Sequence, residues 1–175
     1  MFGDISGFNS LDNSKEAWLA RMDNYAEFML YAQHDDETVG VVFGIVEKNN
    51  SITVGMVAAD ERYRHCGIAS SLIRELEKRV LARGHHFIVL GALEPAERFY
   101  LKCGYIPHLF VQAKPPFKLE KLLSLNDWYD EAWSYDDGTD IRLWIMTKGI
   151  DGELQYKYNE TFPECSTRTL LTKRI

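Results

Sequence analysis

The chain has 175 residues, of which 46% are hydrophobic and 26% charged, and its formal net charge is −6. These values are typical of a soluble globular protein with one domain, or with one domain and a sizeable appendage. No apolar run approaches the ~20 residues of a membrane span, so we predict no membrane association. The acidic balance disfavours nucleic acid as a partner, because binding to a phosphate backbone usually needs a basic face.

The cysteines and histidines give no sign of a metal site. The three cysteines, Cys66, Cys103 and Cys165, lie far apart, without the spacing of a disulfide framework or of metal ligands. Residues 1–10 lack the basic and apolar blocks of an export signal. The sequence therefore predicts a reduced, cytoplasmic protein without bound metal. Four of the histidines fall at expected turns or strand ends and should be solvated: His34, His85, His86 and His108.

The first half of the chain predicts a helix followed by a three-stranded meander. Ser14 is a good N-cap for a helix that contains Trp18 and Met22. Apolar and β-branched segments at 28–32, 39–46 and 52–58 are separated by polar turns, so they should form antiparallel strands.

After these strands, the apolar residues recur with the spacing of a helix. Ile68, Leu72, Leu76 and Val80 recur every four residues, and Gly84 can end the helix in the left-handed conformation. Residues 87–90 form a short apolar run typical of a buried strand. Pro95 suits the first turn of a further helix that stops at Gly104.

The last third predicts the order β-α-β-β-α-β. We expect strands at 108–113, 128–135, 141–146 and 167–175, and a short helix within 117–125. Asp136-Asp137-Gly138 predicts a hairpin turn. Residues 150–162 fit either a helix or a strand, and we favour the helix because Asp151 can cap it. This order is the ferredoxin-like one.

The turn Arg64-His65-Cys66-Gly67-Ile68-Ala69 lies between an expected strand and an amphipathic helix. The first turn of such a helix presents unpaired N–H groups and a favourable dipole to an anion. Small residues at 67 and 69 would let a phosphate approach the backbone. An ordinary tight turn explains the same pattern equally well. The pattern is neither a Walker loop nor a Rossmann fingerprint, so ATP and NAD are poor candidates.

Two segments together resemble one enzyme family. The run Val57-Ala-Ala-Asp-Glu-Arg-Tyr-Arg64-His-Cys-Gly67-Ile-Ala69 resembles the R/Q-x-x-G-x-G/A acyl-CoA motif of the GNAT superfamily of N-acetyltransferases. About thirty residues on, Ala96-Glu-Arg-Phe-Tyr100-Leu-Lys-Cys-Gly104-Tyr105 is similar to the second signature of that family. The resemblance covers residues 25–110. Glu61 replaces a frequent Pro of the family, and His65 replaces a frequent Gly.

The resemblance implies an acetyl-CoA co-substrate and names its site. The pantetheine arm would pair with the backbone of the strand end, the pyrophosphate would lie on the turn, and Tyr100 would protonate the leaving thiolate. The implied cofactor-binding residues are Val57, Ala58, Ala59, Arg64, His65, Cys66, Gly67, Ile68, Ala69 and Ser70. Asp60, Glu61 and Glu94 stay open as the general base, and a water chain would also serve.

Several residues allow a plainer interpretation. Tyr100 can be a core aromatic on a helix. Trp128, Trp133 and Trp144 are packing residues or line an acceptor cleft. Six acidic residues between 122 and 141 either attract a cationic acceptor or form a solvated hairpin: Asp127, Asp130, Glu131, Asp136, Asp137 and Asp140.

The expected fold is α/β (α+β), with a GNAT-like, mixed and mostly antiparallel sheet, flanking helices and a C-terminal α+β extension. We expect an acyl-CoA-binding core at 1–106 with a shortened N-terminus, and the extension at 107–175. The expected function is transfer of an acetyl group to a small-molecule or protein amine by direct attack. The alternative is a non-catalytic acyl-CoA-binding or sensing module. A homodimer is an open alternative to a monomer.

Overall fold

A computed structural model describes residues 14–47, 50–92, 94–125 and 131–175, without the side chains of 94, 95, 131 and 132. The described strands form one eight-stranded sheet in the order β1-β2-β3-β4-β8-β5-β7-β6. One pairing, between β3 and β4, is parallel, and the pairings β1–β2, β2–β3, β5–β7, β5–β8 and β6–β7 are antiparallel. The predicted mixed, mostly antiparallel sheet with flanking helices is therefore confirmed. The chain divides into two compact units, Met1–Leu90 with Lys173–Ile175 (unit 1) and Gly91–Thr172 (unit 2).

Unit 1 contains the predicted helix and meander. Its elements are α1 (Lys15–Tyr25), the 3-10 turn η2 (Ala26–Phe28), β1 (Met29–His34), β2 (Glu37–Val46), β3 (Ile52–Ala59), the 3-10 turn η3 (Glu61–Tyr63), α2 (Ile68–Ala82) and β4 (Phe87–Gly91). The Ser14 side chain accepts a hydrogen bond from the Ala17 N–H, which confirms the predicted cap.

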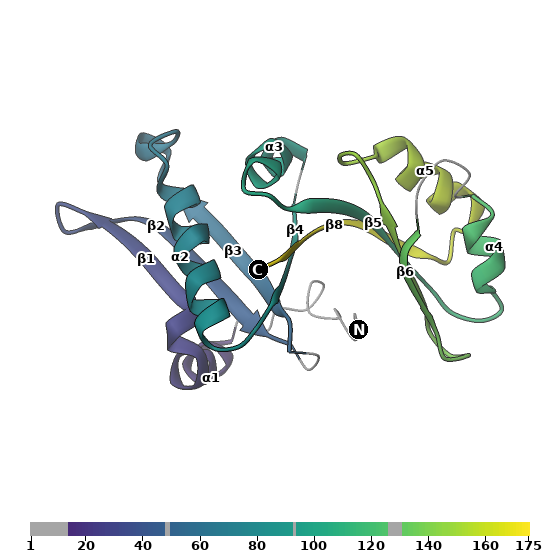
Figure 1. The fold of residues 1–175 in the computed structure, drawn as a ribbon, viewed down its shortest axis with the longest axis horizontal. Helices are drawn as coiled ribbons and strands as arrows, with labels where there is room; N and C mark the ends of the chain where they lie inside the picture. Colours follow the sequence, from purple (N-terminus) through teal and green to yellow (C-terminus); the bar gives the residue numbers. More distant parts are fainter. Residues whose placement is uncertain (1–13, 48–49, 93, 126–130) are drawn as a thin grey trace. The chain divides into compact units, whose positions relative to one another are not determined.

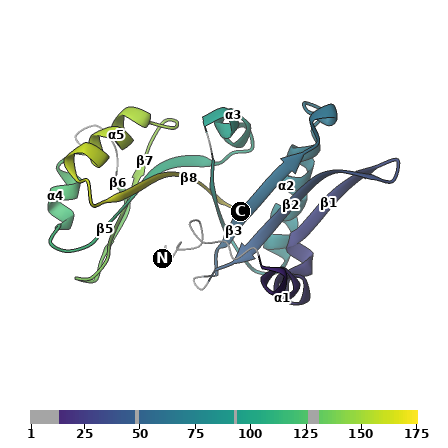
Figure 2. The same cartoon turned by 180° about the vertical axis from the view of Figure 1, so that it is seen from behind.

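Helix α2 covers one face of β1, β2 and β3 (Figures 1 and 2). The four positions of the predicted apolar stripe are half-buried at Ile68 and buried at Leu72, Leu76 and Val80. Gly84 follows the helix at φ +79°, as expected for a left-handed C-terminal residue.

Among the described helices, none is long and apolar enough to cross a membrane.

Unit 2 contains the predicted β-α-β-β-α-β order after one helix. Its elements are α3 (Glu94–Lys102), β5 (Ile106–Ala113), α4 (Leu119–Leu123), β6 (Glu131–Asp136), β7 (Ile141–Met146), α5 (Gly152–Thr161) and β8 (Ser166–Arg174), whose last residues belong to unit 1. Asp151 accepts a hydrogen bond from the Leu154 N–H at 2.8 Å, so the helical interpretation of 150–162 is correct. Residues 126–130 of the predicted strand 128–135 lie outside the described residues.

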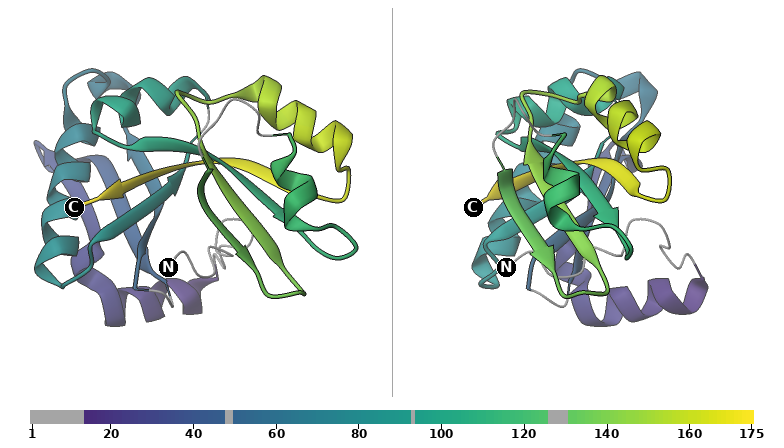
Figure 3. Two further views of the ribbon diagram at one scale, coloured as in Figure 1. Left: turned by 45° about the vertical axis from the view of Figure 1, so that its right-hand side comes forward. Right: turned by 90° about the vertical axis from the view of Figure 1, so that its right-hand side faces the viewer.

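The core of unit 2 lies between its sheet and the helices α4 and α5 (Figure 3). Leu109 and Val111 of β5 are buried there with Leu122 of α4 and with Tyr158 of α5. The Tyr158 hydroxyl donates to the Leu122 carbonyl oxygen at 2.7 Å, so the buried phenol is satisfied. This pairing joins the two helices on the same face of the sheet.

Two histidines are not solvated, contrary to expectation. The exposed fraction is 9% for His85 and 6% for His108. His108 lies within β5, and its Nδ1 lies 3.1 Å from the Ile106 carbonyl oxygen. The apolar strands around it explain its burial.

Two further predictions are not tested by the described residues. The predicted shortened N-terminus concerns residues 1–13, which lie outside the described residues. The predicted domain boundary after residue 106 stays a prediction.

Candidate active site

The predicted turn joins β3 to α2 in unit 1. After η3, the backbone reaches Gly67, whose carbonyl oxygen accepts the first helical hydrogen bond from the Ser71 N–H at 2.9 Å. The N–H groups of Ile68, Ala69 and Ser70 precede that bond, so they have no partner within the helix. The first turn of α2 carries no acidic residue. The helix start is therefore electrostatically suited to an anion.

Two residues of this turn have left-handed backbone conformations. Gly67 has φ +79° and His65 has φ +64°. A Cβ added at Gly67 would meet no atom within 4 Å, so the backbone angle, and not crowding by the protein, accounts for the glycine. His65 takes the position of a frequent family Gly and accepts the less favourable conformation.

Gly40 on β2 sets how closely α2 approaches the sheet at this end. A Cβ at Gly40 would lie 2.6 Å from Cγ2 of Ile68 and 3.1 Å from Cδ1 of Leu72. The missing side chain lets the first turn of α2 rest on the strand. The role of Gly40 is not visible in the sequence, because its partner Ile68 lies 28 residues away and no local pattern links the two.

On the side away from β2, no described strand pairs with the end of β3, and we call this side the open edge. The parallel pairs of β3 with β4 are Ile52 with Ile88 and Thr53 with Val89, so they end well before Ala59. On the other side, β3 pairs with β2 in register as far as Ala59, with an irregularity between Phe43 and Gly44. Residues 54–59 thus extend beyond the parallel pairs.

Hydrogen-bond alternation shows which groups face that open edge. The Asp60 N–H donates to the Val39 carbonyl oxygen at 2.9 Å. In an antiparallel pair, every second residue is hydrogen-bonded to the partner strand, so Ala58 also faces β2. The N–H and C=O groups of Val57 and Ala59 then point to the open side. Of the three predicted backbone residues, these two have the geometry to pair with an extended ligand.

The charged groups of the turn form exposed ion pairs. Arg64 lies 2.8 Å from Glu61, and both side chains are mostly exposed. Exposed ion pairs of this kind contribute little to the free energy of folding, so a phosphate could displace Glu61 from Arg64. His65 and Cys66 are also exposed. The turn can therefore add one cationic side chain to its backbone N–H groups.

The contacts of the candidate general bases show how readily each could accept a proton from the acceptor amine. Asp60 accepts hydrogen bonds from the Arg62 side chain and the Arg62 N–H, which lower the pKa of the Asp60 carboxyl group below its usual range. A carboxylate with a lowered pKa is a weak base. Glu61 pairs with Arg64, and the side chain of Glu94 lies outside the described set.

Tyr100 belongs to α3 in unit 2, whereas the turn belongs to unit 1. Its side chain is 8% exposed and packs edge-on against Phe99 at 4.8 Å and Tyr105 at 5.9 Å between ring centroids. Burial, and next the nearby Cys103, raises the pKa of Tyr100. The phenol therefore keeps its proton at neutral pH, as a general acid requires, and it also packs as a core aromatic would.

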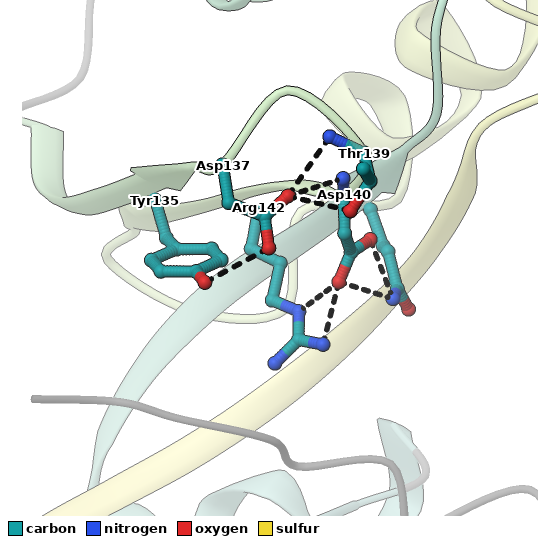
Figure 4. A network of polar contacts seen from close by, with 6 residues as sticks. Tyr135, Asp137, Thr139, Asp140 and Arg142 are labelled. Atoms are coloured by element: carbon teal, nitrogen blue, oxygen red, sulfur yellow. Dashed lines mark hydrogen bonds and ion pairs between the residues drawn. The ribbon is translucent and has the colours of Figure 1, made fainter.

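Asp136 and Asp137 of the β6–β7 hairpin bind their own turn, whereas the Asp140 carboxylate accepts from Arg142 and Gln112 (Figure 4). Asp136 accepts from the Gly138 N–H at 2.8 Å. Asp137 accepts from the N–H groups of Thr139 and Asp140 and from the Tyr135 hydroxyl. These hydrogen bonds support the interpretation as a structural hairpin. Asp127 and Asp130 and the side chain of Glu131 are outside the described set, as is Trp128.

No group of three His, Cys, Asp or Glu residues that could hold a metal ion occurs among the described residues. Cys66, Cys103 and Cys165 are free thiols.

Comparisons with known proteins identify the family. Residues 4–105 match the model of the acetyltransferase (GNAT) family, whereas no curated protein gives a significant match. A Bacillus anthracis protein solved with acetyl coenzyme A is 18% identical with a TM-score of 0.44, and the match covers 67% of this chain but only 59% of that one. An IAA acetyltransferase from Bacillus cereus is 15% identical over 94% of this chain and 87% of that chain, with a TM-score of 0.46.

A third solved structure, the diaminobutyrate acetyltransferase EctA from Paenibacillus lautus, is 17% identical, with a TM-score of 0.44 over 78% of this chain and 80% of that one. The family match spans more than half of the chain and contains both motifs, from the end of β3 to Tyr100. The chain therefore belongs to the acetyltransferase (GNAT) family.

Proposed function

We propose that this acetyltransferase moves the acetyl group of acetyl-CoA to an amine acceptor, with Tyr100 as the general acid. The observation that carries the proposal is the arrangement in unit 1, where η3 and a short turn join the open edge of β3 to the N–H groups at the start of α2, which have no partner within the helix. An extended arm followed by a pyrophosphate matches this order of a strand edge and a helix start.

Each part of the donor would have its own contacts. The backbone of Val57 and Ala59 would pair with the pantetheine amides, as in the addition of a strand. The N–H groups from Gly67 onward would hold the pyrophosphate, and Arg64 would exchange its exposed partner Glu61 for a phosphate oxygen. This exchange is plausible energetically because a charged hydrogen bond to phosphate is stronger than an exposed ion pair.

In the proposed reaction, the thioester supplies the acetyl group and the neutral amine attacks its carbonyl carbon. A C–N bond forms and the C–S bond breaks, with no covalent enzyme intermediate. The N–H group of Val57 or Ala59 would stabilise the developing negative charge on the carbonyl oxygen. Tyr100 would give its proton to the departing sulfur, and a base or a water chain would take the proton from the acceptor nitrogen.

Titration with acetyl-CoA tests donor binding. At about 100 times its dissociation constant, acetyl-CoA should stabilise the chain by about 2.7 kcal/mol, measured as a rise in the thermal unfolding midpoint. If saturating acetyl-CoA leaves the unfolding midpoint unchanged, the proposal fails and the chain is an interaction protein without a donor site.

Tyr100→Phe separates catalysis from binding. The variant should keep its affinity for acetyl-CoA and its unfolding midpoint, because only a hydroxyl group is removed. Turnover should fall by about 10²–10⁴-fold, the usual contribution of a placed general acid. Unchanged turnover would rule out the role of Tyr100. A wild type that binds acetyl-CoA but acetylates no member of a broad amine panel would favour the sensing module.

A further inference from the structure

Arg168 of unit 2 is half-buried and forms no ion pair with the described residues. Nε and Nη1 of Arg168 on β8 are buried without a hydrogen-bond partner. The guanidinium carbon lies 5.1 Å from the centroid of the Phe110 ring. Burial, and next the positive charge of Arg142, lowers the pKa of Arg168. Buried guanidinium N–H groups without a hydrogen-bond partner cost free energy, which an anionic ligand on Nε and Nη1 would offset.

The strand register identifies the surroundings of this cation. Arg168 is opposite Phe110, Phe110 is opposite Trp144, and Trp144 is opposite Trp133. Residues directly opposite one another share a face of the sheet, so these four form one row on the face away from Leu109 and Val111. The Phe110 and Trp144 ring centroids are 4.6 Å apart. The aromatic row next to Arg168 lowers the local dielectric and strengthens any ion pair formed there.

The neighbouring row on the same face consists of Ser166, Gln112, Arg142 and Tyr135. In this row, Arg142 already has a carboxylate partner, Asp140. The Arg142 Nε donates to Asp140 at 2.6 Å and the Gln112 Nε2 donates to the same carboxylate at 3.0 Å (Figure 4). Asp140 thus binds Arg142 and Gln112, and Arg168 has no carboxylate partner in the part of the chain that the structure describes.

A cavity borders this second row. Its volume is about 400 Å³, and it is lined by Gln112, Ala113, Lys114, Glu164 and Ser166. Ser166 lies two residues before Arg168 on the same face of β8, about 7 Å away along the strand. A cavity of this size accommodates a small molecule, and the polar side chains in its mixed lining can hydrogen-bond a ligand. The ligand body could therefore occupy the cavity while its anionic group reaches Arg168.

We propose that unit 2 binds a small organic carboxylate through Arg168, with the body of the ligand in the cavity beside Ser166. The planar guanidinium fork matches a carboxylate, and one uncompensated positive charge suits this singly charged group better than a phosphate monoester of nearly two charges. The site goes beyond acetyl transfer, and its test needs no acetyl-CoA, so it can fail or succeed independently of the proposed function.

The experiment compares carboxylates with their own amides. Calorimetric titration of the full chain uses pentanoate and 5-aminopentanoate, each against the corresponding primary amide. At least one carboxylate should bind with a dissociation constant of about 1 mM or lower, and its amide should bind about ten to a hundred times more weakly, the usual effect of one charged hydrogen bond. Binding of neither carboxylate, or equal binding of acid and amide, overturns the proposal.

Two substitutions and one control assign the effect to Arg168. Arg168→Gln should weaken carboxylate binding about tenfold or more. Lys157→Gln removes an exposed charge on α5 and should leave binding unchanged. Arg168→Met keeps apolar contact with Phe110 and removes the desolvated charge, so its unfolding midpoint should hold or rise while binding is lost. If Arg168→Met or Arg168→Gln binds carboxylate as the wild type does, the site is not at Arg168.

Discussion

Gly67 and Gly84 make a matched pair that tests the role of the turn. They flank the two ends of α2, both have φ +79°, and an added Cβ at either position would meet no atom within 4 Å. Replacing each by Ala therefore imposes the same backbone strain without a clash. Only Gly67 lies at the helix start that we propose for the pyrophosphate.

The expected loss of stability follows from the backbone angle. A left-handed conformation costs a residue with a Cβ about 1–2 kcal/mol. Replacing Gly by Ala also lowers the conformational entropy of the unfolded chain, which stabilises the native state by about 0.4–1 kcal/mol. Each variant should thus lose about 1 kcal/mol, which lowers the unfolding midpoint by about 2–4 °C in a chain of this size.

Binding should differ between the two variants. We expect the added methyl group at residue 67, directly before the N–H groups of Ile68 and Ala69 in the chain, to hinder the close approach of a phosphate. Loss of one charged hydrogen bond, worth about 1.5–3 kcal/mol, corresponds to about a ten- to hundredfold weaker affinity for acetyl-CoA. Gly84→Ala should keep its affinity within about twofold, and titration calorimetry on both variants measures the difference.

Two results would refute this reasoning. If Gly84→Ala weakens acetyl-CoA binding as much as Gly67→Ala, the effect is a general loss of stability. If Gly67→Ala binds as the wild type does while both midpoints fall, the pyrophosphate does not lie on this helix start.

Three further predictions concern single residues. His65→Gly relieves a left-handed conformation at φ +64°, so its free energy of unfolding should equal that of the wild type or exceed it by up to about 1 kcal/mol, measured by denaturant titration. Burial lowers the pKa of His108, although its hydrogen bond to the Ile106 carbonyl raises it in part. The native state then binds fewer protons than the unfolded state, so the stability from this residue is present above about pH 6.5 and is lost as the pH falls. The unfolding midpoint of the wild type should therefore drop more than that of His108→Gln between about pH 7.5 and 5. Tyr158→Phe removes the donor at 2.7 Å from the Leu122 carbonyl oxygen and leaves it the longer contact with the Leu125 N–H at 3.5 Å, so it should cost about 1–3 kcal/mol.

Each of these predictions has a contradicting result. A His65→Gly variant less stable by more than about 1 kcal/mol would mean that the imidazole makes a stabilising contact. Parallel midpoint curves for the wild type and His108→Gln would show that His108 titrates normally in the folded chain. A Tyr158→Phe variant as stable as the wild type would show that the Leu122 carbonyl finds another donor.

Local patterns were sufficient for most elements and for the family motifs. The four-residue period of α2, the caps at Ser14 and Asp151, and the left-handed Gly84 all depend on neighbours within a few residues. Such interactions are encoded in short segments, which is why sequence alone placed the turn between β3 and α2. The burial of His108 was missed because His108 is the first residue of the predicted strand 108–113, where a side chain is usually solvated. In the structure β5 begins at Ile106, so His108 lies inside the strand.

The tertiary structure decided everything that depends on strand partners. Which groups of Val57 and Ala59 face an open edge follows from the register of β2 with β3, and from the early end of the pairs between β3 and β4. Gly40 beneath Ile68 and the isolated Arg168 beside Phe110 are likewise cross-strand or cross-element contacts. The sequence by itself determined the helices, the strands and the motif of the acyl donor. The pairing of distant segments determined which backbone groups and which charged side chain lack a partner among the described residues, because a hydrogen-bonding group or a charge is satisfied by a neighbour in space and not by one in the chain.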